Sequence, residues 1–306
     1  MSKYTVWTQW VDLQIPAGFT ALNPENHPLE TSDNSIIDFY VPTYMGGRKS
    51  FEFVATMPNL KVFQLPNAGY DDALEFLQPD MVICNARGVH DASTAELAMT
   101  LAISARRGMA DFMVAQQNGQ WLHTQYRSFN DSNIAVIGNG SIGQTLKRYL
   151  QPYDVNITMY SRTGSEGSLK ISELDDHITE YDIIFLILPL TSESKNLFDE
   201  KRLRAMKQGA TLVNVARGPI VNTDALIQVL DEGRITAGLD VTDPEPLPTD
   251  HPLWKAKNLI ITPHVGGDSR AFEPRGKRLV EEQLQRLSLD ENLINVVARG
   301  SNAQSL

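Results

Sequence analysis

The stretch NIAVIGNGSIG, residues 133–143, decides the fold of this chain. Its first part, 134–137, is a short apolar run that favours a buried strand and stops at Gly138. Gly140 and Gly143 complete a G-x-G-x-x-G pattern just as a helical spacing of apolar residues begins. Glycine permits the tight turn and the close approach of a ligand, and amides at the following helix N-terminus favour a pyrophosphate. Because the motif lies between a strand and a helix, it predicts dinucleotide binding rather than a structural turn alone.

The composition around this motif describes an ordinary globular protein. With 306 residues, 42% of them hydrophobic and 21% charged, the chain is long enough for two domains with sizeable cores. A net charge of −10 without any basic run argues against a nucleic-acid partner or an anionic membrane surface. The N-terminal residues lack the layout of a signal peptide, and no apolar stretch reaches the length of a membrane span. We therefore expect a cytoplasmic protein.

The chain contains a single cysteine, Cys84, which excludes an internal disulfide. It lies in the apolar run 81–84. This position favours a buried, inert thiol over a reactive one.

The segment before residue 91 alternates apolar runs with helical or loop segments. Such alternation predicts a parallel sheet with helices on its faces. Strands are expected at 5–7, 36–41, 62–65 and 81–83, and helices at about 51–57 and 71–77.

A helix start is predicted at Ser93, because Ser93 and Glu96 have the spacing of a capping box ahead of an amphipathic run. Gly108 follows two arginines and is the expected end of this helix. A second amphipathic segment covers about 111–118. Because the pair leads into the glycine-rich strand, we interpret it as the bridge between two domains.

The alternation restarts at Asn133 and is stronger there. Six strands with intervening helices predict a doubly wound dinucleotide-binding domain. Gly209 and Gly233 are placed where two of the helices should end, and the last 35 or so residues contain one amphipathic helix and a tail. The expected strands are 133–137, 155–160, 182–187, 211–215, 235–239 and 258–262, and the expected helices are about 141–151, 171–177, 199–207 and 223–232.

Polar residues follow three of these strands, where doubly wound folds bind ligands. They are Arg217 in VNVARG, Asp240 and Glu245 in LDVTDPEP, and His264 in ITPHVGG. Histidine can exchange a proton near neutral pH, a neighbouring carboxylate raises its pKa, and a guanidinium binds a carboxylate through two parallel hydrogen bonds. Singly, these residues could be a surface arginine, a loop charge and a core histidine. Together, after a glycine-rich motif, they favour an active site.

These stretches resemble the D-isomer-specific 2-hydroxyacid dehydrogenase family over nearly the whole chain. The resemblance implies an α/β chain with two doubly wound parallel-sheet domains. A Rossmann dinucleotide-binding domain at 91–270 would be inserted into a flavodoxin-like substrate domain made of 1–90 and 271–306. It also implies a homodimer, because 93–121 corresponds to the family's dimer arm. The matching motifs are PNAGYD (66–71), the helix from Ser93, VIGNGSIG (136–143), LILPLT (186–191), VNVARGPIVN (213–222), GLDVTDPEP (238–246) and ITPHVGG (261–267).

The resemblance also implies roles for individual residues, and no metal site. Arg217, Glu245 and His264 would form the catalytic set, and Arg217 would also bind substrate. The backbone of Asn67, Ala68 and Gly69 would help to hold the substrate carboxylate, and Asp240 would face the nicotinamide carboxamide. The implied cofactor-binding residues are Gly138, Asn139, Gly140, Ser141, Ile142, Gly143, Ser161, Arg162, Thr163, Leu188, Pro189, Val215, Ala216, Asp240 and Gly266.

The sequence departs from the family pattern at two places. Members that use NAD usually carry an acidic residue after the second strand, whereas Ser161, Arg162 and Thr163 stand there in this chain, roughly 20 residues after Gly143. An arginine with hydroxyl neighbours attracts the 2′-phosphate of NADP, so NADP is the predicted cofactor, with NAD or use of both as the alternative. Leu188 replaces a histidine that many members have.

We therefore interpret the chain as an NAD(P)-dependent 2-hydroxyacid dehydrogenase that works as a 2-ketoacid reductase on a small-molecule substrate. One alternative is a non-catalytic NAD(P)-sensing protein of the corepressor type. Another is a formate- or phosphite-type dehydrogenase on the same fold, although Glu245 replaces the glutamine of the formate enzymes. The sequence leaves the identity of the ketoacid open.

Overall fold

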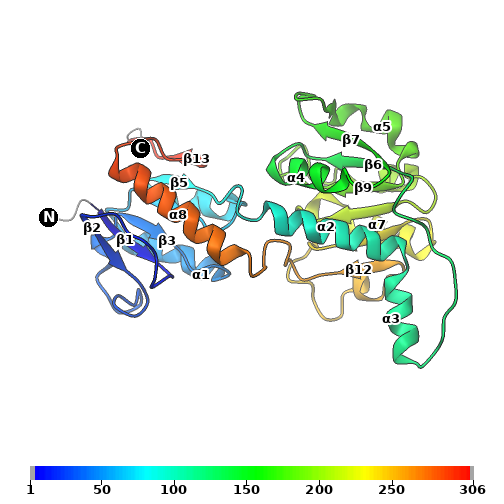
Figure 1. Ribbon diagram of the computed structural model, residues 1–306, viewed down its shortest axis with the longest axis horizontal. Coiled ribbons are helices and arrows are strands. Elements are labelled where there is room, and N and C mark those ends of the chain that lie inside the picture. Colours follow the sequence, from blue (N-terminus) through cyan, green and yellow to red (C-terminus); the bar gives the residue numbers. More distant parts are fainter. Residues whose placement is uncertain (1–3, 304–306) are drawn as a thin grey trace. The chain divides into compact units, whose positions relative to one another are not determined.

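The computed structural model describes residues 4–303 (Figure 1). The chain divides into two compact units, one formed by Met1–His90 with Arg270–Leu306 and the other by Asp91–Ser269. Each unit is a sheet with helices on its faces, and each has its own core. None of the helices formed by the described residues is long and apolar enough to cross a membrane.

The first unit contains a six-stranded sheet in the order β13-β5-β4-β3-β1-β2. Strands β1 to β5 pair in parallel in the order 2-1-3-4-5 of flavodoxin-like folds, and β13 joins the edge antiparallel to β5. The carboxyl ends of the five parallel strands therefore share one edge. The strands are β1 (Tyr4–Thr8), β2 (Phe19–Leu22), β3 (Phe39–Val41), β4 (Val62–Gln64), β5 (Val82–Cys84) and β13 (Val296–Arg299).

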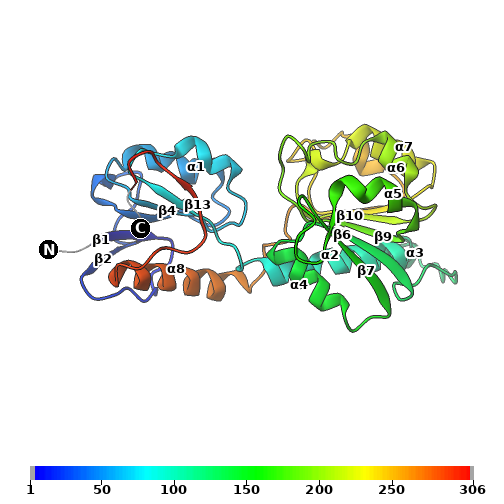
Figure 2. The same ribbon diagram turned by 90° about the horizontal axis from the view of Figure 1, so that it is seen from above.

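Helices cover both faces of this sheet, as Figure 2 shows for α1 (Gly47–Glu52) and α8 (Phe272–Ser288). Successive strand residues alternate between two hydrophobic clusters, as period-two side-chain geometry requires: Val6 packs with the α8 side and Trp7 with the opposite side. Cys84 is fully buried as predicted, and burial raises the pKa of its thiol to about 12, which makes it unreactive.

The first unit differs from the sequence prediction at five places. The helix predicted at about 51–57 is the end of α1, which begins at Gly47, followed by the 3₁₀ helix Phe53–Thr56. Edge strands β2 and β13 were not predicted, because they are short and partly exposed rather than continuous apolar runs. The run predicted as one strand at 36–41 begins with a 3₁₀ turn, Asn34–Ile36, and becomes strand only at Phe39. The helix predicted at 71–77 is the 3₁₀ helix Asp71–Phe76.

The second unit contains a seven-stranded, fully parallel sheet in the order β12-β11-β10-β9-β6-β7-β8. This is the 3-2-1-4-5-6 order of a Rossmann fold with β12 added at one edge. The six predicted strands are all present, and only the two-residue β8 was missed. The strands are β6 (Ser132–Ile137), β7 (Val155–Ser161), β8 (Leu169–Lys170), β9 (Ile183–Leu186), β10 (Thr211–Asn214), β11 (Thr236–Leu239) and β12 (Leu259–Ile261).

Two helix layers enclose this sheet (Figure 2). On one face, α2 (Asp91–Arg106) and α4 (Ser141–Leu150) share a core cluster with strand residues such as Val136. On the other face lie the helices that follow β8, β9 and β10, whose apolar residues form a second cluster. They are α5 (Leu174–His177), α6 (Glu200–Ala205) and α7 (Thr223–Asp231).

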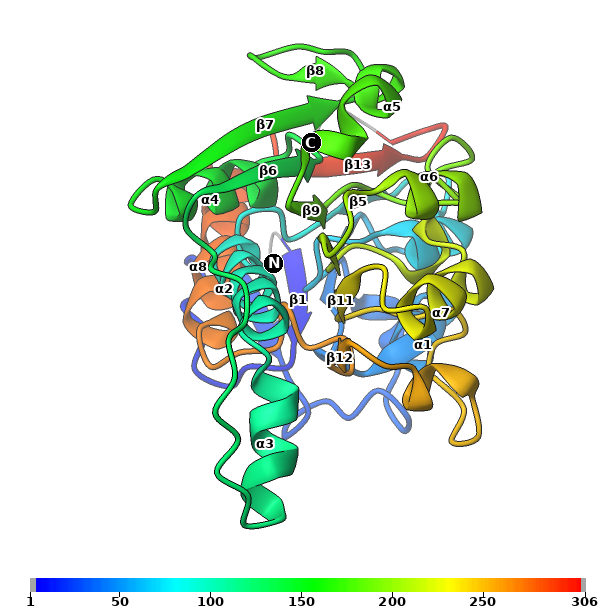
Figure 3. The same cartoon turned by 90° about the vertical axis from the view of Figure 1, so that its right-hand side faces the viewer.

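The helix pair before the glycine-rich strand differs from its predicted form. Helix α2 begins at Asp91, two residues before the predicted cap, so Ser93 lies inside the helix and its hydroxyl is 2.6 Å from that of Ser269. Because α2 packs on α4 and on β10 and β11, it is a layer of the second unit rather than a bridge. Gly108, with φ of +63°, separates it from α3 (Met109–Gln117), which extends away from the sheet of its unit (Figure 3).

Candidate active site

The glycine turn between β6 and α4 uses its three glycines in different ways. Gly138 has φ of +127°, and a Cβ there would lie 2.0 Å from the Ile187 carbonyl oxygen. A Cβ on Gly143 would lie 2.0 Å from the Gly138 carbonyl oxygen, so this glycine lets α4 pack on the turn. A Cβ on Gly140 would have no neighbour within 4 Å. The first and third glycines are therefore needed by the fold, and the second borders open space.

The N-terminus of α4 offers amides to that space. The first hydrogen bond along the helix joins Gln144 N to Gly140 O at 2.9 Å, so the N–H groups of Ser141, Ile142 and Gly143 precede the helical bonding pattern. Amides at a helix N-terminus stabilise negative charge. Asn139 connects this turn to the loop after β7, because its side-chain amide donates to Ser165 O at 3.4 Å. The turn fits the pyrophosphate of a dinucleotide.

The loop after β7 carries the residues predicted to choose the cofactor. Ser161 ends β7, beside the end of β6, and its hydroxyl accepts hydrogen bonds from Gly164 N at 3.0 Å and Ser168 Oγ at 2.7 Å. Arg162 and Thr163 are exposed, and within residues 4–303 no ion pair engages Arg162. The hydroxyl of Ser161 thus braces the loop from which the Arg162 side chain emerges.

A second cation at this strand end was missed by the sequence prediction. Lys170 lies opposite Ser161 in the parallel pairing of β7 and β8, and its side chain is exposed. Its backbone N–H donates to Glu173 at 2.7 Å. A strand of two residues has no periodicity to detect, so only the register of the sheet brings Lys170 beside the predicted cofactor loop.

Arg217 follows β10 in a turn that is held by a buried side chain. Asn214, 1% exposed, donates to Arg217 O at 2.9 Å and accepts from Ala216 N at 3.1 Å. Gly218 lets this turn pack closely against the loop after β11, because a Cβ at this position would lie 1.9 Å from the Thr242 carbonyl oxygen. The guanidinium of Arg217 donates to Ala216 O at 2.8 Å and is partly exposed.

Asp240, at the end of β11, organises the loop that carries His264. Its carboxylate accepts hydrogen bonds from Thr262 Oγ1 at 2.6 Å, Val265 N at 2.9 Å and Gly266 N at 2.8 Å. Its backbone oxygen accepts from His264 N at 2.7 Å. His264 itself has φ of +55°, an uncommon conformation for a residue with a side chain, and the Asp240 contacts hold it there.

His264 and Glu245 form a close pair. Nδ1 of His264 lies 2.5 Å from Oε1 of Glu245, and Oε2 of the same carboxylate accepts from Thr242 N at 3.4 Å. The hydrogen bond with Glu245 raises the pKa of His264, although burial and the charge of Arg217 oppose the rise. Burial alone would raise the pKa of Glu245, but its hydrogen bond with His264 and the charge of that imidazole outweigh burial and lower it.

The other predicted cofactor contacts in this unit are mostly buried. Leu188, Val215 and Ala216 are each 8% exposed and belong to core clusters, whereas Pro189 is exposed. Leu188 packs in an apolar cluster, which explains why a leucine is stable there but gives no reason for the absence of histidine.

Asn67, Ala68 and Gly69 lie in the first unit, in the loop after β4, and are partly buried. Arg48, in the neighbouring helix α1, is engaged by Glu75 through both guanidinium Nη atoms and is therefore committed to an ion pair.

Known proteins are similar to this chain in sequence and in fold. Residues 99–266 match the family model "D-isomer specific 2-hydroxyacid dehydrogenase, NAD binding domain". A glyoxylate reductase of Thermofilum pendens is 34% identical over 245 residues, which are 75% of this chain and 71% of that protein. The chain belongs to the D-isomer-specific 2-hydroxyacid dehydrogenase family. The predicted family and fold class are confirmed, and the protein is an NAD(P)-dependent oxidoreductase of hydroxyacids.

Two solved structures extend this similarity to almost the full length of the chain. A D-isomer-specific 2-hydroxyacid dehydrogenase from Xanthobacter autotrophicus Py2, in complex with NADPH, is 25% identical with a TM-score of 0.75 and aligns over 97% of this chain and 98% of its own. An NAD-dependent formate dehydrogenase from Staphylococcus aureus, in complex with NAD, is 27% identical with a TM-score of 0.71 and aligns over 92% and 89%.

Proposed function

We propose that this dehydrogenase reduces a 2-ketoacid to a D-2-hydroxyacid, with His264 as the proton donor, Glu245 as its partner and Arg217 as the ligand of the substrate. The observation that carries the proposal is the 2.5 Å pair of His264 and Glu245 beside the charge of Arg217. A raised histidine pKa keeps the imidazolium available near neutral pH, which suits donation of a proton.

The hydrogen bonds of His264 assign its two ring nitrogens. Nδ1 is engaged by Glu245, which leaves Nε2 to protonate the carbonyl oxygen of the substrate. NAD(P)H, when bound, supplies the hydride that the carbonyl carbon receives. Glu245 stabilises the imidazolium before the transfer and fixes the ring, while Asp240 holds the backbone of the His264 loop.

Arg217 would bind the carboxylate of the substrate. The planar guanidinium binds a carboxylate through two hydrogen bonds and polarises the adjacent carbonyl. In the first unit, which we propose as the substrate domain, the backbone N–H groups of Asn67, Ala68 and Gly69 would be carboxylate donors. Glyoxylate and hydroxypyruvate are the first substrates to test, because the Thermofilum pendens relative is a glyoxylate reductase.

We propose NADPH as the preferred cofactor. Ser161 stands where an acidic residue would repel a 2′-phosphate, and Arg162 and Lys170 present two exposed cations at the same strand end. The Xanthobacter relative that binds NADPH has the same fold over nearly its whole length.

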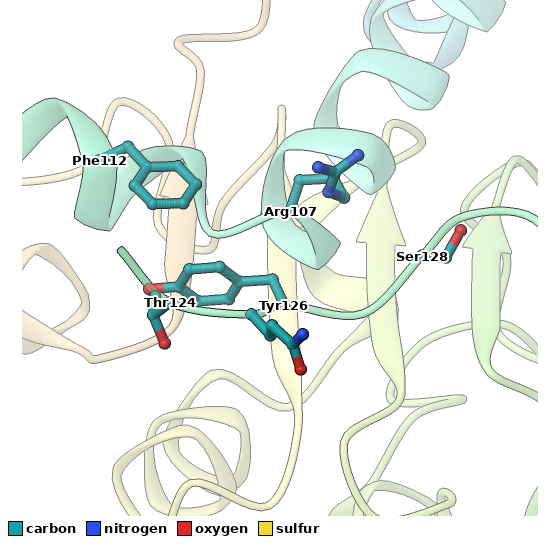
Figure 4. Close-up of a pocket in the computed structure, with 6 residues that line it drawn as sticks. Arg107, Phe112, Thr124, Tyr126 and Ser128 are labelled. Atoms are coloured by element: carbon teal, nitrogen blue, oxygen red, sulfur yellow. The ribbon is translucent and has the colours of Figure 1, made fainter. Parts of the chain in front are cut away.

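We also propose a homodimer formed through α3 and the segment that follows it. This arm exposes Met113, Val114 and Trp121, the last with 97% of its surface accessible. At its base, the ring of Tyr126 packs edge-on against Phe112 beside a cavity of about 310 Å³ (Figure 4). A second copy of the chain would cover the exposed apolar residues by two-fold symmetry. Sedimentation velocity should show a dimer that Trp121→Asp converts to a monomer, and a wild-type monomer would exclude this assembly.

The assay that tests the proposed reaction follows absorbance at 340 nm with NADPH or NADH and glyoxylate, hydroxypyruvate, pyruvate or bulkier 2-ketoacids. Turnover of a ketoacid that is lost in His264→Ala supports the proposal. Tight NADPH binding without turnover of any ketoacid would favour a sensor, and turnover of phosphite or formate with NADP⁺ or NAD⁺ would identify the other alternative.

A further inference from the structure

The loop after β4 is held by hydrogen bonds from the loop after β5. Three consecutive carbonyl oxygens accept hydrogen bonds from it: Pro66 O from Nε2 of His90 at 2.8 Å, Asn67 O from the backbone N–H of Ala86 at 2.8 Å, and Ala68 O from Nδ2 of Asn85 at 2.7 Å. Strands β4 and β5 are parallel neighbours, so their carboxyl ends bring these two loops together.

The N–H groups of the same loop are left for another partner. Within residues 4–303, the N–H groups of Asn67, Ala68 and Gly69 make no hydrogen bond, although these residues are partly buried. Successive backbone N–H groups in a turn can bind an anion. The three bonded carbonyls of 66–68 hold this stretch of backbone in place.

We propose that Asn85 and His90 are positioning residues, which hold the loop at 66–69 so that its N–H groups bind the carboxylate of the substrate. This inference rests on the proposed function. It assigns to two buried side chains a role that neither the glycine motif nor the charged residues at the sheet ends indicated.

The contacts of Asn85 fix its orientation without ambiguity. The Ala68 carbonyl can only accept a hydrogen bond, so the Asn85 side-chain atom facing it is the amide nitrogen. The backbone N–H of Arg87 can only donate, so the other side-chain atom, 3.2 Å away, is the oxygen. Asn85 is 5% exposed. A carboxylate in its place would keep the Arg87 contact and face the Ala68 carbonyl with a like partial charge.

Two fully buried glutamines, Gln64 and Gln283, form a hydrogen-bond network with the backbone of Asn85. Gln64 donates to Asn85 O at 3.2 Å and to Leu65 O at 2.9 Å, and its oxygen accepts from Gln283 at 2.9 Å. Gln283, on α8, also donates to Ile294 O at 2.8 Å and accepts from Ile294 N at 3.0 Å. Every side-chain donor and acceptor atom of the pair has a partner, and such a satisfied buried network specifies a single arrangement.

His90 supports the start of the loop with both its ring and its nitrogen. Because Pro66 O can only accept, Nε2 carries the hydrogen in this contact. The ring stacks parallel to Phe272, with centroids 5.4 Å apart, and near Tyr44 at 5.6 Å. Phenylalanine would keep the stack and remove the Nε2 donor, whereas glutamine would keep a donor and remove the stack.

The test compares steady-state kinetics of glyoxylate reduction by NADPH in wild type, Asn85→Asp, His90→Phe and His90→Gln. We expect KM for glyoxylate to rise about tenfold in Asn85→Asp and several-fold in His90→Phe, with kcat within about threefold and KM for NADPH unchanged. His90→Gln should recover part of the loss. Oxalate, an unreactive dicarboxylate, should bind more weakly to Asn85→Asp by a similar factor in calorimetry.

Asn59→Asp is the matched control, because Asn59 in the same unit makes the same kind of bond, from its side-chain amide to Ser35 O at 2.7 Å, but is exposed. It should leave both KM values unchanged. If Asn85→Asp and His90→Phe lower the melting temperature while KM for glyoxylate and the oxalate affinity stay at wild-type values, the residues are merely structural and the inference is wrong.

Failure of the proposed function has a different signature. In that case the wild type reduces neither glyoxylate nor hydroxypyruvate, and oxalate binding alone decides the inference. Weaker oxalate binding in Asn85→Asp than in wild type would still support it, and a wild type that does not bind oxalate would overturn it.

Discussion

The carboxyl ends of the two sheets are built from different groups. In the second unit, they carry ionisable side chains that act on one another, with His264 paired to Glu245 in the field of Arg217. In the first unit, the loop after β4 offers neutral backbone N–H groups, and the buried side chains of Asn85 and His90 hold this loop by hydrogen bonds to its carbonyl oxygens. We infer that the two units have different roles. The titratable groups of the second unit would transfer the proton, and the loop after β4 in the first unit would bind the anion.

The largest expected effect comes from His264→Ala. Removing the proposed proton donor should lower kcat for ketoacid reduction by about two to four orders of magnitude and leave NADPH binding intact. The matched control is His177→Ala, because His177 also pairs with a glutamate, Glu180, at 3.2 Å, but on the surface of α5. Normal turnover in His264→Ala, or an equal loss in His177→Ala, would contradict the assignment.

Arg217→Lys tests whether substrate binding depends on the charge of this residue alone or on its planar guanidinium group. Lysine keeps the charge but loses the second hydrogen bond, so kcat/KM for glyoxylate should fall by about tenfold to a hundredfold. The melting temperature should change little, because the turn is braced by Asn214 and the backbone. Unchanged kinetics in this variant would remove Arg217 from the proposed site.

The next prediction concerns cofactor preference. It tests whether the side chain of Arg162, just after β7, acts on the cofactor rather than on the fold. A single guanidinium–phosphate contact is worth about 1.5–3 kcal/mol, so Arg162→Ala should reduce the ratio of kcat/KM for NADPH to that for NADH by about tenfold to a hundredfold. Ser161→Asp should lower the same ratio by repulsion. Arg278→Ala, an exposed arginine of the first unit, is the control. The proposal fails if the wild type prefers NADH or if Arg162→Ala leaves the ratio unchanged.

The smallest expected effect distinguishes Gly140, which we propose borders the bound cofactor, from Gly143, which lets α4 pack on the turn. Gly140→Ala meets no neighbour within 4 Å, so the melting temperature should hold while KM for the cofactor rises several-fold to about tenfold. Gly143→Ala would place a Cβ 2.0 Å from Gly138 O and should destabilise the whole unit. Equal losses of stability in the two variants would show that the open space at Gly140 has no functional meaning.

The second unit was easier to predict from sequence than the first, and the reason is visible in particular strands. Strand β6 is nearly continuous apolar sequence next to a glycine motif, so its position and type followed directly. Strand β13 joins the sheet through antiparallel pairing with β5, more than 200 residues earlier, and its residues are only partly buried. Nothing in its local sequence indicates that partner.

The same contrast applies to the candidate sites. Arg217, Glu245 and His264 were predicted as site residues because each is a charged or titratable residue that follows an apolar run. Asn85 and Gln283 are neutral amides in the core, and their importance depends on contacts between distant segments. The N-terminal cap predicted for α2 at Ser93 illustrates the opposite error, a local motif that the tertiary packing did not use.

The measurement that tests the central claim most directly is the pH dependence of kcat/KM for glyoxylate reduction by NADPH, in wild type and Glu245→Gln. In the proposed mechanism reduction needs protonated His264, so activity should be full below the pKa of this residue and fall as the pH rises through it. Glu245 raises that pKa, and its neutralisation should therefore move the falling limb to lower pH. The same limb in both enzymes, or no limb in the wild type, would contradict the account.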